Sequence, residues 1–160
     1  MSATFENLRV LQAAEEVADA VWKQISAWNE FARDTVGKQL ARAVDSIGAN
    51  IAESFGRFNF GEKLQFLYYA RGSLFETKYW LNRVKVRELM PVADAQNYIV
   101  RLTDLARQLN TLASGLKTVR AGEQKRPRTL RELAAEYSVA NWEDFPDDLF
   151  SEAELTWLNS

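Results

Sequence analysis

The sequence predicts an all-α protein, an antiparallel up-down-up-down four-helix bundle followed by a short helical, acidic C-terminal extension. Apolar residues recur three or four positions apart along most of the region 1–120, which is the period of an α-helix. No segment alternates apolar and polar residues with a period of two, so a sheet is not expected. The three prolines, at positions 91, 127 and 146, stand between the periodic segments, where each marks a boundary.

The first half of the bundle is expected to contain two amphipathic helices. One covers about residues 5–31 and the other about residues 34–54, each with a stripe of apolar side chains at helical spacing. The stretch FNFG at residues 58–61 ends the second pattern, because Asn and Gly tolerate chain reversals that other residues resist.

Two further helices are expected in the second half. A third helix covers about residues 62–87, and a fourth extends from the region of Pro91 to about Val119. Pro91 suits the first turn of a helix, because its missing N–H would have no intrahelical partner there. The connections between these long helices are short, which favours antiparallel neighbours.

Composition divides the chain into a bundle at residues 1–120, a basic linker at 121–128 and an acidic aromatic tail at 129–160. The bundle has sixteen Lys and Arg against thirteen Asp and Glu, a net of plus three; the linker has three basic residues and one acid, a net of plus two; the tail has one Arg and eight acids, a net of minus seven. A Ser or Thr followed three residues later by Glu forms a capping box, and this pattern predicts short helices near residues 130–138 and 152–158.

The chain has no cysteine and no histidine. Their absence removes disulfides, Ser-His and Cys-His nucleophiles and nearly every transition-metal site. It also removes the side chain that titrates near neutral pH. We therefore expect no enzymatic activity, no cofactor and no metal. We see no membrane span or signal peptide, so a cytoplasmic location is expected.

The third helix is apolar on two faces. One arc holds leucines that belong in the core, whereas Phe66, Tyr69 and Trp80 fall on nearly the opposite side. A helix in a thin bundle cannot bury both faces against its own chain. We therefore expect self-association through these three aromatic residues. The alternative is that the tail covers them within one copy, through Trp142, Phe145 and Leu149.

Charged and polar residues also fall beside the predicted core. Arg71 and Lys78 lie inside the core-facing arc of the third helix, where an unpaired charge is costly. A polar strip follows the second helix at spacings of three and four: Ser46, Asn50, Glu53 and Arg57. We expect a structural strip, with Asn50 or Glu53 reaching Arg71. The alternative makes Glu53 an acid-base group and Arg71 an anion clamp, although no nucleophile or phosphate-binding loop accompanies them.

Two linked motifs carry a family resemblance. SIGANIAESFGR at residues 46–57 and FLYYARGSLFET at residues 66–77 resemble the signature of bacterial four-helix bundle proteins encoded by intervening sequences of large-subunit ribosomal RNA genes. The matching residues are Ser46, Asn50, Ile51, Ala52, Glu53, Arg57, Ala70, Arg71, Gly72, Ser73, Leu74 and Glu76. Gly48 replaces the usual proline and Ser54 the usual glycine. The resemblance covers about residues 5–119 and leaves out the tail.

The resemblance implies a homopentamer of antiparallel bundles arranged as a barrel, with no known catalysis. From the residues themselves we expect a structural polar network that joins helices or subunits, formed by Ser46, Asn50, Glu53, Arg57, Arg71 and Glu76. Distant relatives of this architecture are accessory proteins of diversity-generating retroelements, which bind a reverse transcriptase and nucleic acid through a strongly basic surface. The bundle of this chain is only slightly basic.

Two functions are therefore in competition. The first is an oligomeric scaffold that binds a protein partner through the tail, where acids stand next to apolar and aromatic residues. The candidate contacts are Trp142, Phe145, Leu149, Phe150 and Trp157. The second is binding of RNA or DNA, regulated by the acidic tail. Its candidates are Lys125, Arg126, Arg128 and Arg131, with Arg83, Arg87 and Arg101 of the bundle.

Overall fold

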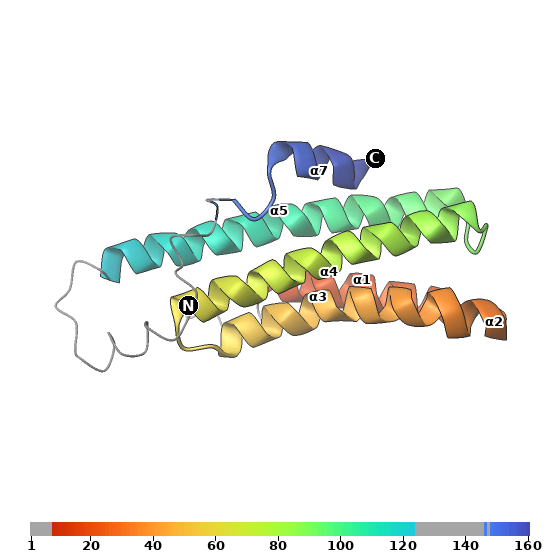
Figure 1. The fold of residues 1–160 in the computed structure, drawn as a ribbon, viewed down its shortest axis with the longest axis horizontal. Coiled ribbons are helices and arrows are strands. Elements are labelled where there is room, and N and C mark those ends of the chain that lie inside the picture. The colour runs from red at the N-terminus through yellow and green to blue at the C-terminus, as the bar shows by residue number, and fades with distance from the viewer. Residues whose placement is uncertain (1–7, 124–145, 147) are drawn as a thin grey trace.

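The computed structural model describes residues 8–123, 146 and 148–160, and all regular structure in these residues is helical (Figure 1). The all-α prediction is thus confirmed for the described part of the chain. The elements are α1 (Arg9–Ser26), α2 (Glu30–Ala32), the π-helical turn η2 (Arg33–Gly37), α3 (Lys38–Gly56), α4 (Phe60–Val86), α5 (Val92–Glu123) and α7 (Glu152–Asn159). No helix among the described residues has the length and hydropathy needed to cross a membrane.

Four long helices, α1, α3, α4 and α5, lie lengthwise beside one another (Figure 1). α3 packs on α1 and α4, and α5 packs on α4 and α1. The space between them is filled by aliphatic side chains that are fully buried, among them Leu40, Ile47, Leu67, Leu74, Ile99 and Leu102. Each such side chain stabilises the fold by about 1.5–3 kcal/mol relative to an exposed position.

The first predicted helix is interrupted at residues 27–29. α1 ends at Ser26, and Asn29 caps α2 because its side-chain oxygen accepts a hydrogen bond from the Ala32 N–H at 2.9 Å. The prediction of one helix up to residue 31 is therefore wrong, since this cap starts a new helix. The following run from α2 through η2 to α3 begins earlier than the predicted residue 34.

Gly37 allows the turn η2 to pack closely on α1. A β-carbon at this position would lie 2.7 Å from Cγ2 of Ile25, a distance that real side chains do not tolerate. A π-helical turn shifts the register of the side chains that follow it. Gly37 and the π-helical turn together determine which side chains of α3 face α1 and α4.

The bounds of α4 and α5 are close to those expected. α4 covers residues 60–86, and the Pro91 carbonyl accepts hydrogen bonds from the N–H groups of Asp94 and Ala95 at 3.0 and 3.1 Å. α5 then continues to Glu123, so the first three residues of the predicted linker are helical. A glycine such as Gly122 weakens a helix by only about 1 kcal/mol and does not by itself end it.

α7 coincides with the helix predicted near residues 152–158. Both halves of its capping box are present: the Glu154 N–H donates to Oγ of Ser151, and the Glu154 carboxylate accepts from the Ser151 N–H. α7 packs on α5 (Figure 1). The helix predicted near residues 130–138 lies outside the described residues.

Candidate interaction site

The polar strip of α3 is satisfied mainly within that helix. Oγ of Ser46 donates to the Arg42 carbonyl at 2.7 Å, and Nδ2 of Asn50 donates to the Ser46 carbonyl at 2.8 Å. Glu53 and Arg57 form an ion pair one turn apart. Two contacts cross to α4: Nδ2 of Asn50 donates to Oγ of Ser73 at 3.4 Å, and the Arg57 guanidinium lies 4.5 Å from the centroid of the Phe66 ring. The strip therefore contributes one long hydrogen bond and one cation–ring contact between helices.

Arg71 does not meet the strip. We expected Asn50 or Glu53 to reach it, but its guanidinium donates from Nε to the Leu149 carbonyl at 2.6 Å and forms an ion pair with Glu154. The reason is the helical period, because Arg71 and the strip-facing Ser73 point about 200° apart around α4. Glu76 accepts a long hydrogen bond, 3.4 Å, from the indole of Trp80 on its own helix. The six candidate residues thus divide into separate local contacts.

The outer side of α4 carries aromatic side chains, and we call Phe66, Tyr69 and Trp80 the aromatic face. Phe66 and Tyr69 meet edge to face at 5.4 Å between ring centroids, and Trp80 meets Tyr79 in the same way at 5.0 Å. Tyr69 is 49% exposed and Tyr79 54% exposed. The described part of the tail does not cover this face, because it packs elsewhere on α4 and α5; Trp142 and Phe145 lie outside the described residues.

The C-terminal segment, defined as residues 148–160, buries an apolar surface against α4 and α5. Its buried side chains are Leu149, Phe150, Leu155 and Leu158. The ring of Phe75 on α4 stacks on two rings of the segment, Phe150 at 5.8 Å and Trp157 at 5.4 Å between centroids. Aromatic pairs of this kind add about 0.5–1.5 kcal/mol beyond their buried area.

Two side chains of the bundle hold the backbone of this segment. The amide of Asn110 makes a reciprocal pair with Phe150: its Oδ1 accepts from the Phe150 N–H and its Nδ2 donates to the Phe150 carbonyl, both at 2.7 Å. Arg71 holds the neighbouring Leu149 carbonyl. We call Arg71, Phe75 and Lys78 of α4, together with Asn110 of α5, the docking groove. Asn110 was not singled out in the sequence, where one asparagine in a helix carries no signal.

Lys78 is buried under the C-terminal segment. It is 1% exposed, and its Nζ has no hydrogen-bond acceptor among the described residues. The ammonium lies 5.8 Å from the ring of Trp157, at which distance a cation is attracted to the ring face. Burial lowers the pKa of Lys78 below its usual value, and the positive charge of Lys85 lowers it further. The prediction of a costly cation in the core-facing arc thus applies to Lys78.

Glu154 joins the cap of α7 to the groove. Burial by itself would raise the pKa of Glu154, but the hydrogen bond from the Ser151 N–H and the Arg71 guanidinium together hold this pKa below its usual value. The carboxylate is therefore ionised at neutral pH, and it serves two purposes at once. It completes the capping box and it forms the charged contact with α4.

A family model describes most of these elements. The model of the 23S rRNA-intervening sequence protein family matches residues 6–111. The chain belongs to this family. Among curated proteins, none matches the chain. In this intervening-sequence protein the match ends one residue after Asn110, so all four residues of the docking groove lie inside the family region and the C-terminal segment lies outside it.

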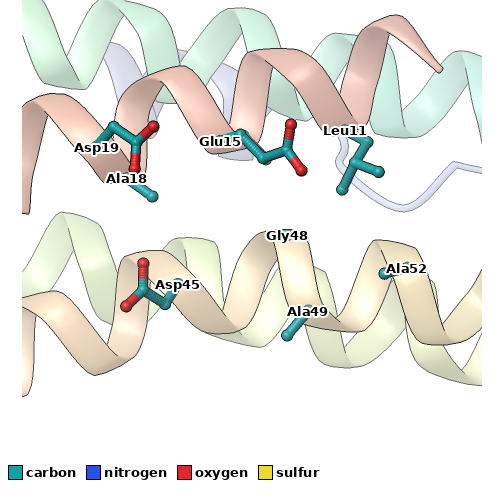
Figure 2. Close-up of a pocket in the computed structure, with 9 residues that line it drawn as sticks. Leu11, Glu15, Ala18, Asp19, Asp45, Gly48, Ala49 and Ala52 are labelled. Carbon is teal, nitrogen blue, oxygen red and sulfur yellow. The ribbon is translucent and has the colours of Figure 1, made fainter. Parts of the chain in front are cut away.

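A second concave surface of the intervening-sequence protein lies between α1 and α3. It is a groove of about 450 Å³ lined by small residues and three carboxylates, Glu15 and Asp19 of α1 and Asp45 of α3. Figure 2 shows these carboxylates along the space between the two helices. Burial raises the pKa of Asp45, and the negative charge of Asp19 raises it further. No cluster of three metal-ligating side chains occurs in the described residues.

The basic candidates are only partly described. Lys125, Arg126, Arg128 and Arg131 lie outside the described residues. Arg83 belongs to the last turn of α4, where Lys85 adds a second cation. Arg101 of α5 lies 3.9 Å from the carboxylate of Glu16 on α1. Of the three bundle candidates, Arg83 and Arg87 thus lie at the C-terminal end of α4 and Arg101 lies on α5.

Proposed function

We propose that this intervening-sequence protein is a non-catalytic, oligomeric interaction protein. In this proposal the four long helices form an antiparallel up-down-up-down bundle, and copies join through the aromatic face of α4. The observation that carries the proposal is the exposure of aromatic rings on the outer side of α4, where Tyr69 is 49% and the neighbouring Tyr79 54% exposed, with Phe66 and Trp80 half-buried beside them. The resemblance to the pentameric family supports a homopentameric barrel, and a protein partner is expected to bind the assembled form.

The physical argument concerns the two sides of α4. Its leucines fill the core, whereas Tyr69 and Tyr79 are exposed on the outer side of α4. Phe66 and Trp80 are half-buried, and Trp80 packs against the edge of the core. Large aromatic side chains gain free energy when they leave water, and clusters of them mark interaction surfaces on soluble proteins. A self-complementary interface would bury the same patch on every copy.

The test is the mass of the full-length protein in solution, measured by light scattering after size exclusion. We expect wild-type protein to have about five times the mass of one chain. The double variant Tyr69→Glu/Tyr79→Glu, at the two exposed rings of this side of α4, should shift to smaller species, because two carboxylates would be placed in the interface. Trp22→Glu is the matched control, since Trp22 is 61% exposed on α1. A monomeric wild-type protein would overturn the proposal.

The partner is proposed to contact the C-terminal tail. Leu149 and Phe150, expected as partner contacts, are buried against the bundle, so among the described residues of the tail Trp157, 47% exposed, is the ring that a partner can reach. Acids next to such a ring can steer toward a basic protein surface while the ring supplies buried area. Pull-down with the full chain should recover a partner that a chain lacking residues 129–160 does not. If the shortened chain retained every partner, the tail would have no part in binding.

A second candidate function is nucleic-acid binding, favoured by the cations Arg83 and Lys85 in the last turn of α4. Oligomerisation multiplies such a small basic cluster, and phosphate contacts by Lys and Arg make binding salt-dependent. Titration with single-stranded RNA at two salt concentrations tests it. We expect weak, salt-dependent binding that strengthens when residues 129–160 are removed, because the acidic tail opposes phosphate. Affinity that is unchanged by salt would contradict it.

A further inference from the structure

We propose that the docking groove is an exchange site between copies: the C-terminal segment of one copy seats in the groove of a second copy. This inference rests on the proposed self-association, which brings grooves and segments of several copies together. It adds a specific contact that the aromatic face does not provide. Exchange of identical elements between protomers is a low-cost route to a stable assembly.

The groove binds the segment through contacts that involve only groove residues and residues of the segment. Two hydrogen bonds of 2.7 Å connect Asn110 to the Phe150 backbone, and one of 2.6 Å connects Arg71 to the Leu149 carbonyl. The ion pair of Arg71 with Glu154 fixes the start of α7. All these partners lie in residues 148–160, so the same contacts are available to a segment that arrives from another copy.

The burial in the groove is large enough for a stable site. Phe150 is 1% exposed, and three leucines of the segment are buried beside it. Burial of such apolar side chains removes them from water and favours docking. Gathering the copies in one oligomer raises the effective concentration of each segment near its neighbours' grooves.

The length of the connection also permits exchange. Residues 124–145 join Glu123 to Pro146, a connection of 22 residues, which reaches about 70 Å when extended. The Pro146 carbonyl accepts a hydrogen bond from Lys117, which precedes Glu123 by six residues, or about 9 Å along a helix. Seating the segment on its own copy therefore uses a small part of the available reach.

The experiment uses full-length chains in which p-benzoylphenylalanine replaces Trp157, a residue that stacks on Phe75. One batch carries ¹⁴N and the other ¹⁵N; the two are mixed in equal amounts, reassembled from urea and irradiated. Mass spectrometry then reads the label on each half of every α7–α4 crosslink. If every segment docks on another copy and the copies mix at random, about half of the crosslinks join a ¹⁴N chain to a ¹⁵N chain. Crosslinks that all carry a single label overturn the inference.

A charge-reversal pair gives a second measurement. In Arg71→Glu and in Glu154→Arg each chain is mismatched with its own segment, because Arg71 and Glu154 are partners. When the two variants are mixed, each groove matches the segment of the other variant. We expect few crosslinks from either variant alone and abundant mixed-label crosslinks from the mixture. A mixture that stays as poorly crosslinked as its components contradicts exchange.

Light scattering on the same samples separates the two proposals. An oligomer with single-label crosslinks overturns the exchange and leaves the self-association standing. A monomer with single-label crosslinks overturns both.

Discussion

At the residue scale, Lys78 is a single side chain whose buried charge lowers the stability of the fold. Its ammonium is buried without a hydrogen-bond acceptor among the described residues, and an unsatisfied buried donor costs about 1–3 kcal/mol. We therefore expect Lys78→Met, which keeps the length of the side chain, to raise the free energy of unfolding by about 1–3 kcal/mol. The change is measured by urea denaturation of the full-length protein.

The control for this variant is Lys38→Met. Lys38 is on α3, its side chain is 65% exposed, and it pairs with Asp34 one turn away. Removing such a surface charge changes stability by about 0.5 kcal/mol or less. If the Lys78 variant were no more stable than this control, the attraction of the ammonium to the Trp157 ring would offset the cost of its burial.

Asp45 supports a prediction about pH. Because folding raises the pKa of Asp45 above 3.8, the folded protein binds this proton more tightly than the unfolded chain does. Ionised Asp45 therefore lowers stability above its raised pKa, and this cost disappears as the pH falls below 3.8. The side chain of Asp45 is largely exposed and only its partial desolvation between α1 and α3 raises the pKa, so the cost is small. We expect Asp45→Asn to raise Tm by about 1–2 °C at pH 7.

Thermal melts of both proteins from pH 7 downward check this sign. The advantage of the Asp45 variant should shrink toward zero as the pH approaches 3.8. An advantage that stayed constant over this range would point to a cause other than the charge.

The site residues show which kind of contact a sequence reveals. The strip from Ser46 to Arg57 was predictable, because its contacts follow from spacings of three and four within one helix. The partner of Arg71 was not, since Leu149 is 78 positions away in the chain. Local periodicity places Arg71 on the core-facing arc, but only the packed structure shows which segment covers that arc.

At the element scale, α7 depends on its cap more than a longer helix would. A helix of eight residues is not stable alone in water, so the capping box and the docking groove must hold it together. We expect Ser151→Ala to destabilise the docked segment by about 1 kcal/mol. Amide hydrogen exchange at Leu155, whose N–H donates to the Ser151 carbonyl at 2.9 Å, should become faster.

Ser114→Ala on α5 serves as the comparison. Ser114 is an exposed position inside a long helix, where alanine has the higher helix propensity. Exchange at Leu155 should be unaffected by this change. Equal rates in wild type and in the Ser151 variant would mean that groove contacts alone position α7.

Caps and apolar periodicity explain which helix boundaries could be predicted from the sequence and which could not. The Ser151 box predicted the start of α7, and apolar periodicity predicted the lengths of α4 and α5. The cap at Asn29 was missed because apolar spacing continues across it, and periodicity alone does not register a break of three residues. The register shift at η2 likewise leaves no mark in an apolar pattern.

At the scale of the whole molecule, protonation of Lys78 is linked to docking of the C-terminal segment. Docking places Trp157 over Lys78 and buries its ammonium, and this burial holds the pKa of Lys78 below the usual 10.5 in the docked state. The docked protein therefore binds fewer protons than the undocked protein between these two pKa values. It follows that docking becomes stronger as the pH rises through that window, by up to about tenfold per pH unit.

Hydrogen exchange of the Phe150 amide measures this linkage, because that N–H is bonded to Asn110 only when the segment is docked. After correction for the intrinsic pH dependence of exchange, protection of Phe150 should increase with pH in the wild type. In Lys78→Met protection should be higher at neutral pH and should not change across the window. Glu154, whose pKa is held below its usual value, stays ionised there and does not contribute to the slope. An equal slope in both proteins would assign the linkage to another group.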